Sequence, residues 1–111
     1  MLTPDKIVEL AIGALENKKA KDITTLRTTE VTILADYFII CTATSVTHLK
    51  TLADEVEKVL KDNDEAPRRR EGSRSSGWVL LDFACVVVHL FLQETREFYT
   101  LERLWSDAQT V

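Results

Sequence analysis

Residues 72–105, GSRSSGWVLLDFACVVVHLFLQETREFYTLERLW, decide how this chain folds. Two dense apolar runs stand inside this segment, WVLLDF at 78–83 and VVVHLF at 86–91. Short apolar runs that are rich in β-branched and aromatic residues are typical of buried strands. The two runs therefore predict a buried β-hairpin. The charged and aromatic sequence QETREFYTLERLW at 93–105 predicts a short helix after it.

Length and composition suit one soluble domain that spans residues 1–111. The chain has 111 residues, of which 45% are hydrophobic and 29% are charged, enough for a core and a charged surface. Its formal net charge of −4 disfavours DNA and extensive RNA binding, because phosphate recognition favours a basic domain. A mildly acidic surface suits a basic protein partner instead.

The sequence shows no sign of a membrane or export segment. No apolar run approaches the roughly 18 residues that a membrane span needs, so no membrane partner is expected. The first ten residues, MLTPDKIVEL, include acidic residues and lack the pattern of a signal or transit peptide. We therefore expect a cytoplasmic protein.

The remaining apolar pattern predicts two long helices and three more strands. Helical spacing begins at Pro4 and at Val46, and Thr3 and Ser45 are good N-cap residues before them. The run YFIICT at 37–42 is apolar on both faces, as in the centre of a sheet. The order α-β-β-α-β-β-β-α indicates an α/β fold with a mixed five-stranded sheet flanked by helices. The predicted strands are residues 23–27, 37–42, 68–71, 78–83 and 86–91.

The connections between these elements are short. Residues 28–35 form a connecting segment in which Val31 and Leu34 are expected to be buried. The charged segment 68–71 is expected nearer an edge of the sheet. Residues 72–77, GSRSSG, are expected to form a flexible loop, too short to link two domains.

The first strand of the hairpin has apolar residues on both faces. Alternation places Trp78, Leu80 and Asp82 on one face of the sheet, and Val79, Leu81 and Phe83 on the other. Both faces therefore need cover, and two long helices with one short helix do not easily supply it. Our hypothesis is that part of one face is left for another molecule, as exposed apolar patches often indicate. The alternative is that loops and the last helix complete the cover.

The cysteine and histidine residues give weak support for a metal or catalytic site. Cys41 and Cys85 lie in apolar strand-like runs and are expected to be reduced, packed thiols, with a disulfide only if their strands are neighbours. His48 and His89 are the two histidines, too few for a metal site with these spacings. His89 is expected to be partly buried in the core and hydrogen-bonded. No cofactor and no metal are predicted.

Nucleophilic catalysis is also poorly supported. Cys85 and His89 stand four residues apart on one strand, which places them ~13 Å apart, too far to act together. A pairing of Cys41 with His89 across strands stays open at this point. Nucleotidyltransferases combine a Gly-Ser loop with paired metal-binding aspartates, whereas TATS at 42–45 lacks the glycine and no Asp-x-Asp occurs on a predicted strand.

Four segments together resemble the RsfS/iojap family of ribosomal silencing factors. They are ADYFIICTATSVTH at 35–48, REG at 70–72, WVLLDFACVVVHLF at 78–91 and REFYTLERLWSDA at 96–108. They match in order and spacing over nearly the whole chain. The family usually has Gly-Asp where this chain has Ala84-Cys85, and Gly where Ala43 stands. Because glycine reaches positive φ freely and alanine does not, the hairpin turn is open to a change of type.

The resemblance implies a nucleotidyltransferase-like fold that is not an enzyme. Members bind protein fourteen of the large ribosomal subunit, block joining of the small subunit and lower translation when nutrients are scarce. The resemblance also implies a homodimer when the protein is free. The alternatives are a nucleotidyltransferase-like nucleotide-binding module or enzyme, and a homodimeric adaptor that uses the same apolar face.

Two groups of residues are predicted to contact the partner. The first is Trp78, Leu80 and Asp82, with Trp78 supplying apolar area and Asp82 pairing with a basic side chain. The second, on the outer surface of the last helix, is Arg96, Tyr99 and Glu102. Trp78 has the alternative of a core role at the strand end, and Asp82 that of capping a turn.

The chain also has one basic cluster, RRR at 68–70. One interpretation is a solvated edge strand. The other is a minor contact with ribosomal RNA phosphates beside the protein partner.

Overall fold

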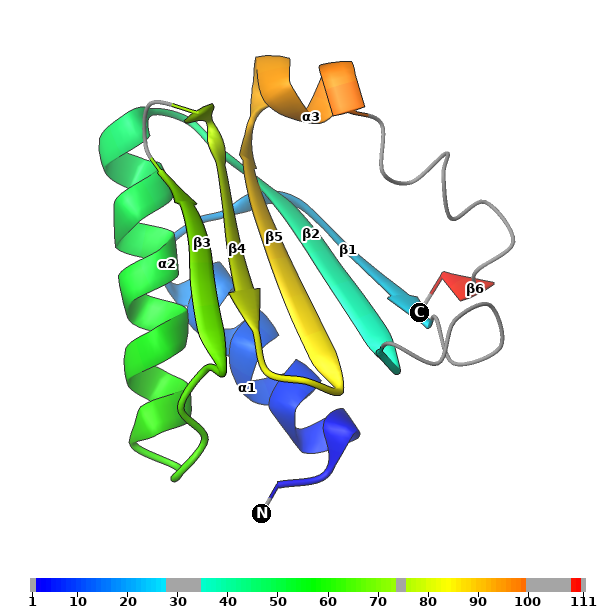
Figure 1. The fold of residues 1–111 in the computed structure, drawn as a ribbon. Helices are drawn as coiled ribbons and strands as arrows, with labels where there is room; N and C mark the ends of the chain where they lie inside the picture. The colour runs from blue at the N-terminus through cyan, green and yellow to red at the C-terminus, as the bar shows by residue number, and fades with distance from the viewer. Residues whose placement is uncertain (1, 28–34, 74–75, 100–108, 111) are drawn as a thin grey trace.

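A mixed β-sheet organises the chain (Figure 1). The computed structural model describes residues 2–27, 35–73, 76–99 and 109–110. The predicted order of three helices and five strands is confirmed, and a sixth strand of two residues follows. The elements are α1 Pro4–Asn17, β1 Lys21–Arg27, β2 Tyr37–Ala43, α2 Val46–Lys61, β3 Arg69–Ser73, β4 Trp78–Asp82, β5 Val86–Leu92, α3 Gln93–Tyr99 and β6 Gln109–Thr110.

The strands lie in the order β3-β4-β5-β2-β1-β6, with β2 and β5 parallel and the other neighbours antiparallel. The prediction that β2 is central is confirmed, because it lies between β5 and β1 and every residue except Phe38 is buried. The charged strand β3 lies at an edge, also as predicted.

The loop predicted at residues 72–77 is shorter than expected. Strand β3 continues through Gly72 to Ser73, where it pairs with Trp78, so β3 and β4 form a second hairpin. Gly72 has φ +90°, and a Cβ at this position would collide with the carbonyl oxygen of Trp78. The flexible-loop interpretation was therefore wrong for the start of this segment, because glycine there allows a close approach of two backbones.

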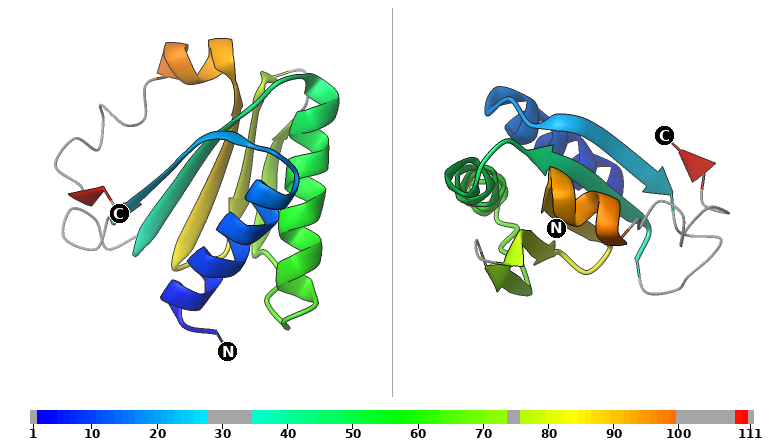
Figure 2. Two further views of the ribbon diagram at one scale, coloured as in Figure 1. Left: turned by 180° about the vertical axis from the view of Figure 1, so that it is seen from behind. Right: turned by 90° about the horizontal axis from the view of Figure 1, so that it is seen from above.

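Helices α1 and α2 pack on the same face of the sheet (Figure 2). Both predicted N-caps are confirmed: Thr3 Oγ1 accepts the Lys6 N–H at 3.2 Å, and Ser45 Oγ accepts the His48 N–H at 3.0 Å. The main core fills the space between these helices and the strands. Its fully buried side chains include Ile7, Leu15, Ile39, Leu49, Leu52, Val56, Leu60, Leu81 and Leu90.

The face away from α1 and α2, here called the second face, carries a smaller cluster. Leu26, Ile40 and Phe91 form its buried centre, and Phe38 and Trp78 pack against them. The short helix α3 continues directly from β5 and lies at the end of the sheet where β2 and β5 finish (Figure 1). Within the described ranges, no long helix lies on the second face.

Arg96 ties α3 to the sheet. Its Nη1 donates to the carbonyl oxygen of Asp22 at 2.6 Å and to Thr42 Oγ1 at 2.9 Å. Its Nη2 donates to Thr24 Oγ1 at 3.3 Å. Arg96 is therefore only partly exposed, and not fully on the outer surface as expected, because hydrogen-bond acceptors of β1 and β2 bind the guanidinium.

The turn between β4 and β5 holds a left-handed alanine. Ala84 has φ +71°, a conformation that glycine adopts more easily. Asp82 Oδ1 accepts the Ala84 N–H at 2.7 Å, and the Phe83 N–H donates to the carbonyl of Val86 at 2.9 Å. These hydrogen bonds hold Ala84 in the backbone conformation that the glycine usual in the resembling family would favour. The positive φ is therefore kept although the residue is alanine.

This geometry predicts opposite effects for two substitutions that each change one methyl group. Ala84→Gly removes the left-handed strain and should raise the free energy of unfolding by about 1 kcal/mol. Gly72→Ala adds a Cβ against the Trp78 carbonyl and should lower it by at least about 2 kcal/mol. Urea unfolding of the three chains measures both changes. A destabilised Ala84→Gly chain would contradict the strain assigned to Ala84.

Candidate functional site

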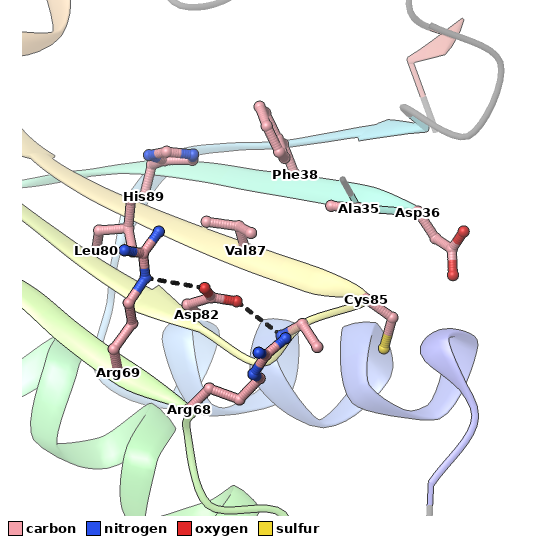
Figure 3. A pocket seen from close by; sticks show the side chains of 11 residues that line it. Ala35, Asp36, Phe38, Arg68, Arg69, Leu80, Asp82, Cys85, Val87 and His89 are labelled. Atoms are coloured by element: carbon pink, nitrogen blue, oxygen red, sulfur yellow. Dashed lines mark hydrogen bonds and ion pairs between the residues drawn. The ribbon is translucent and has the colours of Figure 1, made fainter. Parts of the chain in front are cut away.

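A half-exposed row of side chains on β4 faces away from the two long helices. Trp78, Leu80 and Asp82 are each partly exposed, whereas Val79 and Leu81 are buried in the main core. This alternation confirms the predicted division of the strand into two faces. A hollow of about 560 Å³ adjoins the row (Figure 3). Its lining includes Phe38, Arg68, Leu80, Asp82, Val87 and His89.

Asp82 has two partners already. Its Oδ2 accepts from Arg69 Nε at 3.0 Å, and its Oδ1 accepts the Ala84 N–H at 2.7 Å (Figure 3). Its side chain is 17% exposed, so the carboxylate remains within reach of a third group. The turn-capping interpretation is thus present in the structure. A basic side chain of a partner would share Asp82 with Arg69.

Trp78 combines an exposed part with a fixed ring. Its indole stacks on Phe91 with ring centroids 5.1 Å apart and planes 30° apart. Its Nε1 donates to His89 Nδ1 at 3.2 Å. A ring held on two sides loses little rotamer freedom when a partner covers it, which favours its use as an anchor.

His89 is the polar centre of the second face. It is 5% exposed, and burial lowers the pKa of its imidazole to about 4, so the ring is neutral near pH 7. Because an indole nitrogen can only donate, His89 Nδ1 must be the acceptor, and the proton of the neutral ring lies on Nε2. Nε2 has no hydrogen-bond partner among the described residues. The predicted hydrogen bond of His89 is confirmed, whereas the unsatisfied nitrogen could not be foreseen from sequence.

The two cysteines do not form a nucleophilic site with His89. Cys41 lies in the main core beneath the helices, whereas the neighbouring Ile40 aligns with His89 and faces the other way. Burial raises the pKa of the Cys41 thiol to about 12. The pKa of Cys85 is also raised, first by burial and then by the nearby charge of Asp36. Both thiols are free, as predicted, and protonated at neutral pH.

Ion pairs engage two of the three arginines in the predicted basic cluster at residues 68–70. Arg69 pairs with Asp82 and Glu71, and Arg70 pairs with Asp54 at 3.0 Å. Arg68 is exposed and lines the hollow.

The second predicted contact group is only partly visible. Tyr99 is the last residue of α3, and its side chain is not described. Glu102 lies outside the described residues, as do Val31 and Leu34.

Two features are absent from the described ranges. These ranges contain no group of three or more His, Cys, Asp or Glu residues arranged to hold a metal ion. No helix in this part of the chain is long and apolar enough to cross a membrane.

These features define a class of protein, an α/β domain with helices on one face of its sheet. The other face carries the half-exposed row of Trp78, Leu80 and Asp82 beside a hollow. A family model described as "Ribosomal silencing factor during starvation" matches residues 2–111. The chain therefore belongs to the RsfS family of ribosomal silencing factors.

Individual relatives agree with this assignment. The ribosomal silencing factor RsfS of Halalkalibacterium halodurans is 36% identical over 110 residues, covering 99% of this chain and 94% of the relative. A mouse protein called mitochondrial assembly of ribosomal large subunit protein 1 is 32% identical, over 89% of this chain and 45% of that protein. A crystal structure of a Chromobacterium violaceum protein superposes with a TM-score of 0.91 at 39% identity, covering 95% of this chain and 88% of that one.

The buried histidine predicts a defined dependence of stability on pH. The folded pKa of about 4 lies below the ordinary 6.5, so below pH 6.5 the unfolded chain binds a proton that the folded chain does not. The contribution of His89 is full above pH 6.5 and is lost as the pH falls toward 4. Acidification from pH 7 to pH 5 should therefore lower the free energy of unfolding by roughly 2 kcal/mol through His89.

The measurement is urea unfolding of the parent chain and of His89→Asn at both pH values. The parent should lose more stability on acidification than the variant, because asparagine does not titrate. Equal losses would show that His89 keeps an ordinary pKa in the folded chain.

Proposed function

We propose that this protein binds protein fourteen of the large ribosomal subunit and thereby prevents the small subunit from joining. Translation would fall when nutrients are limiting. The observation that carries the proposal is the half-exposed row of Trp78, Leu80 and Asp82 on the sheet face away from both long helices. To keep the small subunit away, the protein needs only to bind the large subunit and to occupy space at the contact face. No chemical reaction is required.

Three further observations support this proposal. The family is one of ribosomal silencing factors. The name of the mouse relative refers to assembly of the ribosomal large subunit, which makes that subunit the natural partner to test. The formal net charge of −4 favours encounter with a basic protein, because opposite charges steer association.

Each predicted contact residue has a role that its geometry suggests. Trp78 and Leu80 would supply apolar area, and Asp82 would share its carboxylate between Arg69 and a basic side chain of the partner. Tyr99 and Glu102 remain proposed contacts at and beyond the end of α3. Arg96 would act by holding α3 in place through its bonds to β1 and β2.

The secondary partners are part of the same proposal. Arg68 is the member of the basic cluster best placed for a minor contact with ribosomal RNA, because Arg69 and Arg70 are engaged in ion pairs. We further propose that the free protein is a cytoplasmic homodimer. Sedimentation equilibrium at several concentrations tests the dimer independently of ribosome binding.

Trp78→Ala tests the proposed contact. The variant should fold, because Trp78 packs against the small cluster and not in the main core. It should weaken binding to purified large subunits by about 2 kcal/mol or more, as expected for an aromatic anchor at an interface. Co-sedimentation at graded concentrations measures the affinity, and the melting temperature of the free variant reports on its fold.

Glu9→Ala is a suitable control, because the Glu9 side chain is 71% exposed on α1, which packs on the other face of the sheet. It should bind as the parent does. Unchanged binding of Trp78→Ala would remove Trp78 from the contact, and loss of folding would assign it a core role. Magnesium-dependent nucleotide binding by the chain in calorimetry would favour the nucleotidyltransferase-like alternative.

A further inference from the structure

The imidazole of His89 carries a hydrogen-bond donor that no group in the described part of the chain satisfies. Trp78 occupies Nδ1, which leaves the proton on Nε2, and this nitrogen is buried without a partner. Buried polar groups in folded proteins are nearly always hydrogen-bonded, because leaving one unpaired is costly. The free chain therefore holds a donor whose acceptor must come from elsewhere if it is to be satisfied.

The position of His89 connects this donor to the hollow. His89 lines the hollow together with the apolar side chains of Phe38, Leu80 and Val87, and charged residues that include Arg68, Arg69 and Asp82 complete the lining (Figure 3). The edge of the Phe38 ring meets the imidazole at a centroid distance of 5.0 Å and an interplanar angle of 65°. Nε2 is closed to water in the free chain. A partner atom can reach Nε2 only if a neighbouring side chain moves, and we expect this to be Phe38, which is half-exposed, contacts the imidazole and lines the hollow.

We propose that His89 Nε2–H donates a hydrogen bond to an uncharged oxygen of the protein partner, a backbone carbonyl or a hydroxyl, whose apolar neighbours cover Leu80 and Val87. This inference rests on the proposed function and assigns the chemistry of contact at the centre of that site. It adds a specificity-determining residue beside the row of Trp78, Leu80 and Asp82.

The geometry selects among possible partner groups. A lysine or arginine cannot bond to His89, because its single acceptor already receives the Trp78 N–H. A carboxylate is better placed at Arg68 or Arg69, which line the same hollow, than beside the buried neutral ring of His89, where it would be desolvated. An uncharged oxygen has neither disadvantage. Basic groups of the partner belong instead at Asp82, which pairs with Val87, two residues before His89 on β5.

Two matched substitutions distinguish the two nitrogens of the ring. The amide oxygen of asparagine lies close to the place of Nδ1 and can still accept from Trp78, but its side chain is too short to reach the place of Nε2. Glutamine is one methylene longer, so its amide N–H can reach that place. The experiment measures the affinity of the parent chain, His89→Asn and His89→Gln for purified large ribosomal subunits, with melting temperatures of the free chains as the check on folding.

We expect His89→Asn to bind roughly tenfold more weakly than the parent and His89→Gln to remain within about threefold. The reverse order would overturn the inference and show that His89 acts by positioning Trp78. Equal affinities of the two variants, whether lowered or unchanged, would also overturn the inference. Binding would then not depend on which of the two ring nitrogens the replacement side chain imitates. In each of these cases the proposed function stands. A parent chain that does not bind large subunits would overturn both.

Discussion

The parallel pairing of β2 with β5 is the constraint on which the rest of the structure depends. Parallel neighbours need a crossover connection, and here the crossover contains α2 and the β3–β4 hairpin. Helix α2 lies on one face of the sheet, and α1 packs beside it on the same face. The second face therefore receives no long helix within the described ranges, although its strands are apolar on that side too.

On the second face, polar and aromatic side chains hold one another in place although no long helix covers them. Trp78 stacks on Phe91 and donates to His89, so its partly exposed ring is held in a fixed orientation. Asp82 is held by Arg69 and by the turn at Ala84, so its charge is compensated in the free protein. A surface of this kind presents apolar area to a partner, while its polar atoms are mostly engaged in internal hydrogen bonds.

Local sequence patterns predicted the parts of this structure that depend on neighbouring residues. Period-two alternation separated Trp78, Leu80 and Asp82 from the buried side of β4, and apolar residues on both faces placed β2 in the centre. Thr3 and Ser45 were recognised as N-caps because a cap acts within one turn of its helix.

The features that sequence did not predict depend on distant partners or on backbone geometry. Arg96 turns inward because Asp22, Thr24 and Thr42, more than fifty residues earlier, offer it oxygens. The pairing of Asp82 with Arg69 and the unsatisfied nitrogen of His89 likewise follow from strand order. The continuation of β3 through Gly72 depends on a close backbone approach that residue type alone does not specify.

Hydroxyl-radical footprinting of the chain, alone and bound to large ribosomal subunits, tests the role of the second face most directly. Mass spectrometry would report oxidation of individual side chains in both states. Contact through the second face predicts that Phe38, Trp78 and Leu80 become protected on binding, while exposed positions on α1 and α2 react equally in both states. Protection of the helices with unchanged reactivity of Trp78 and Leu80 would contradict it.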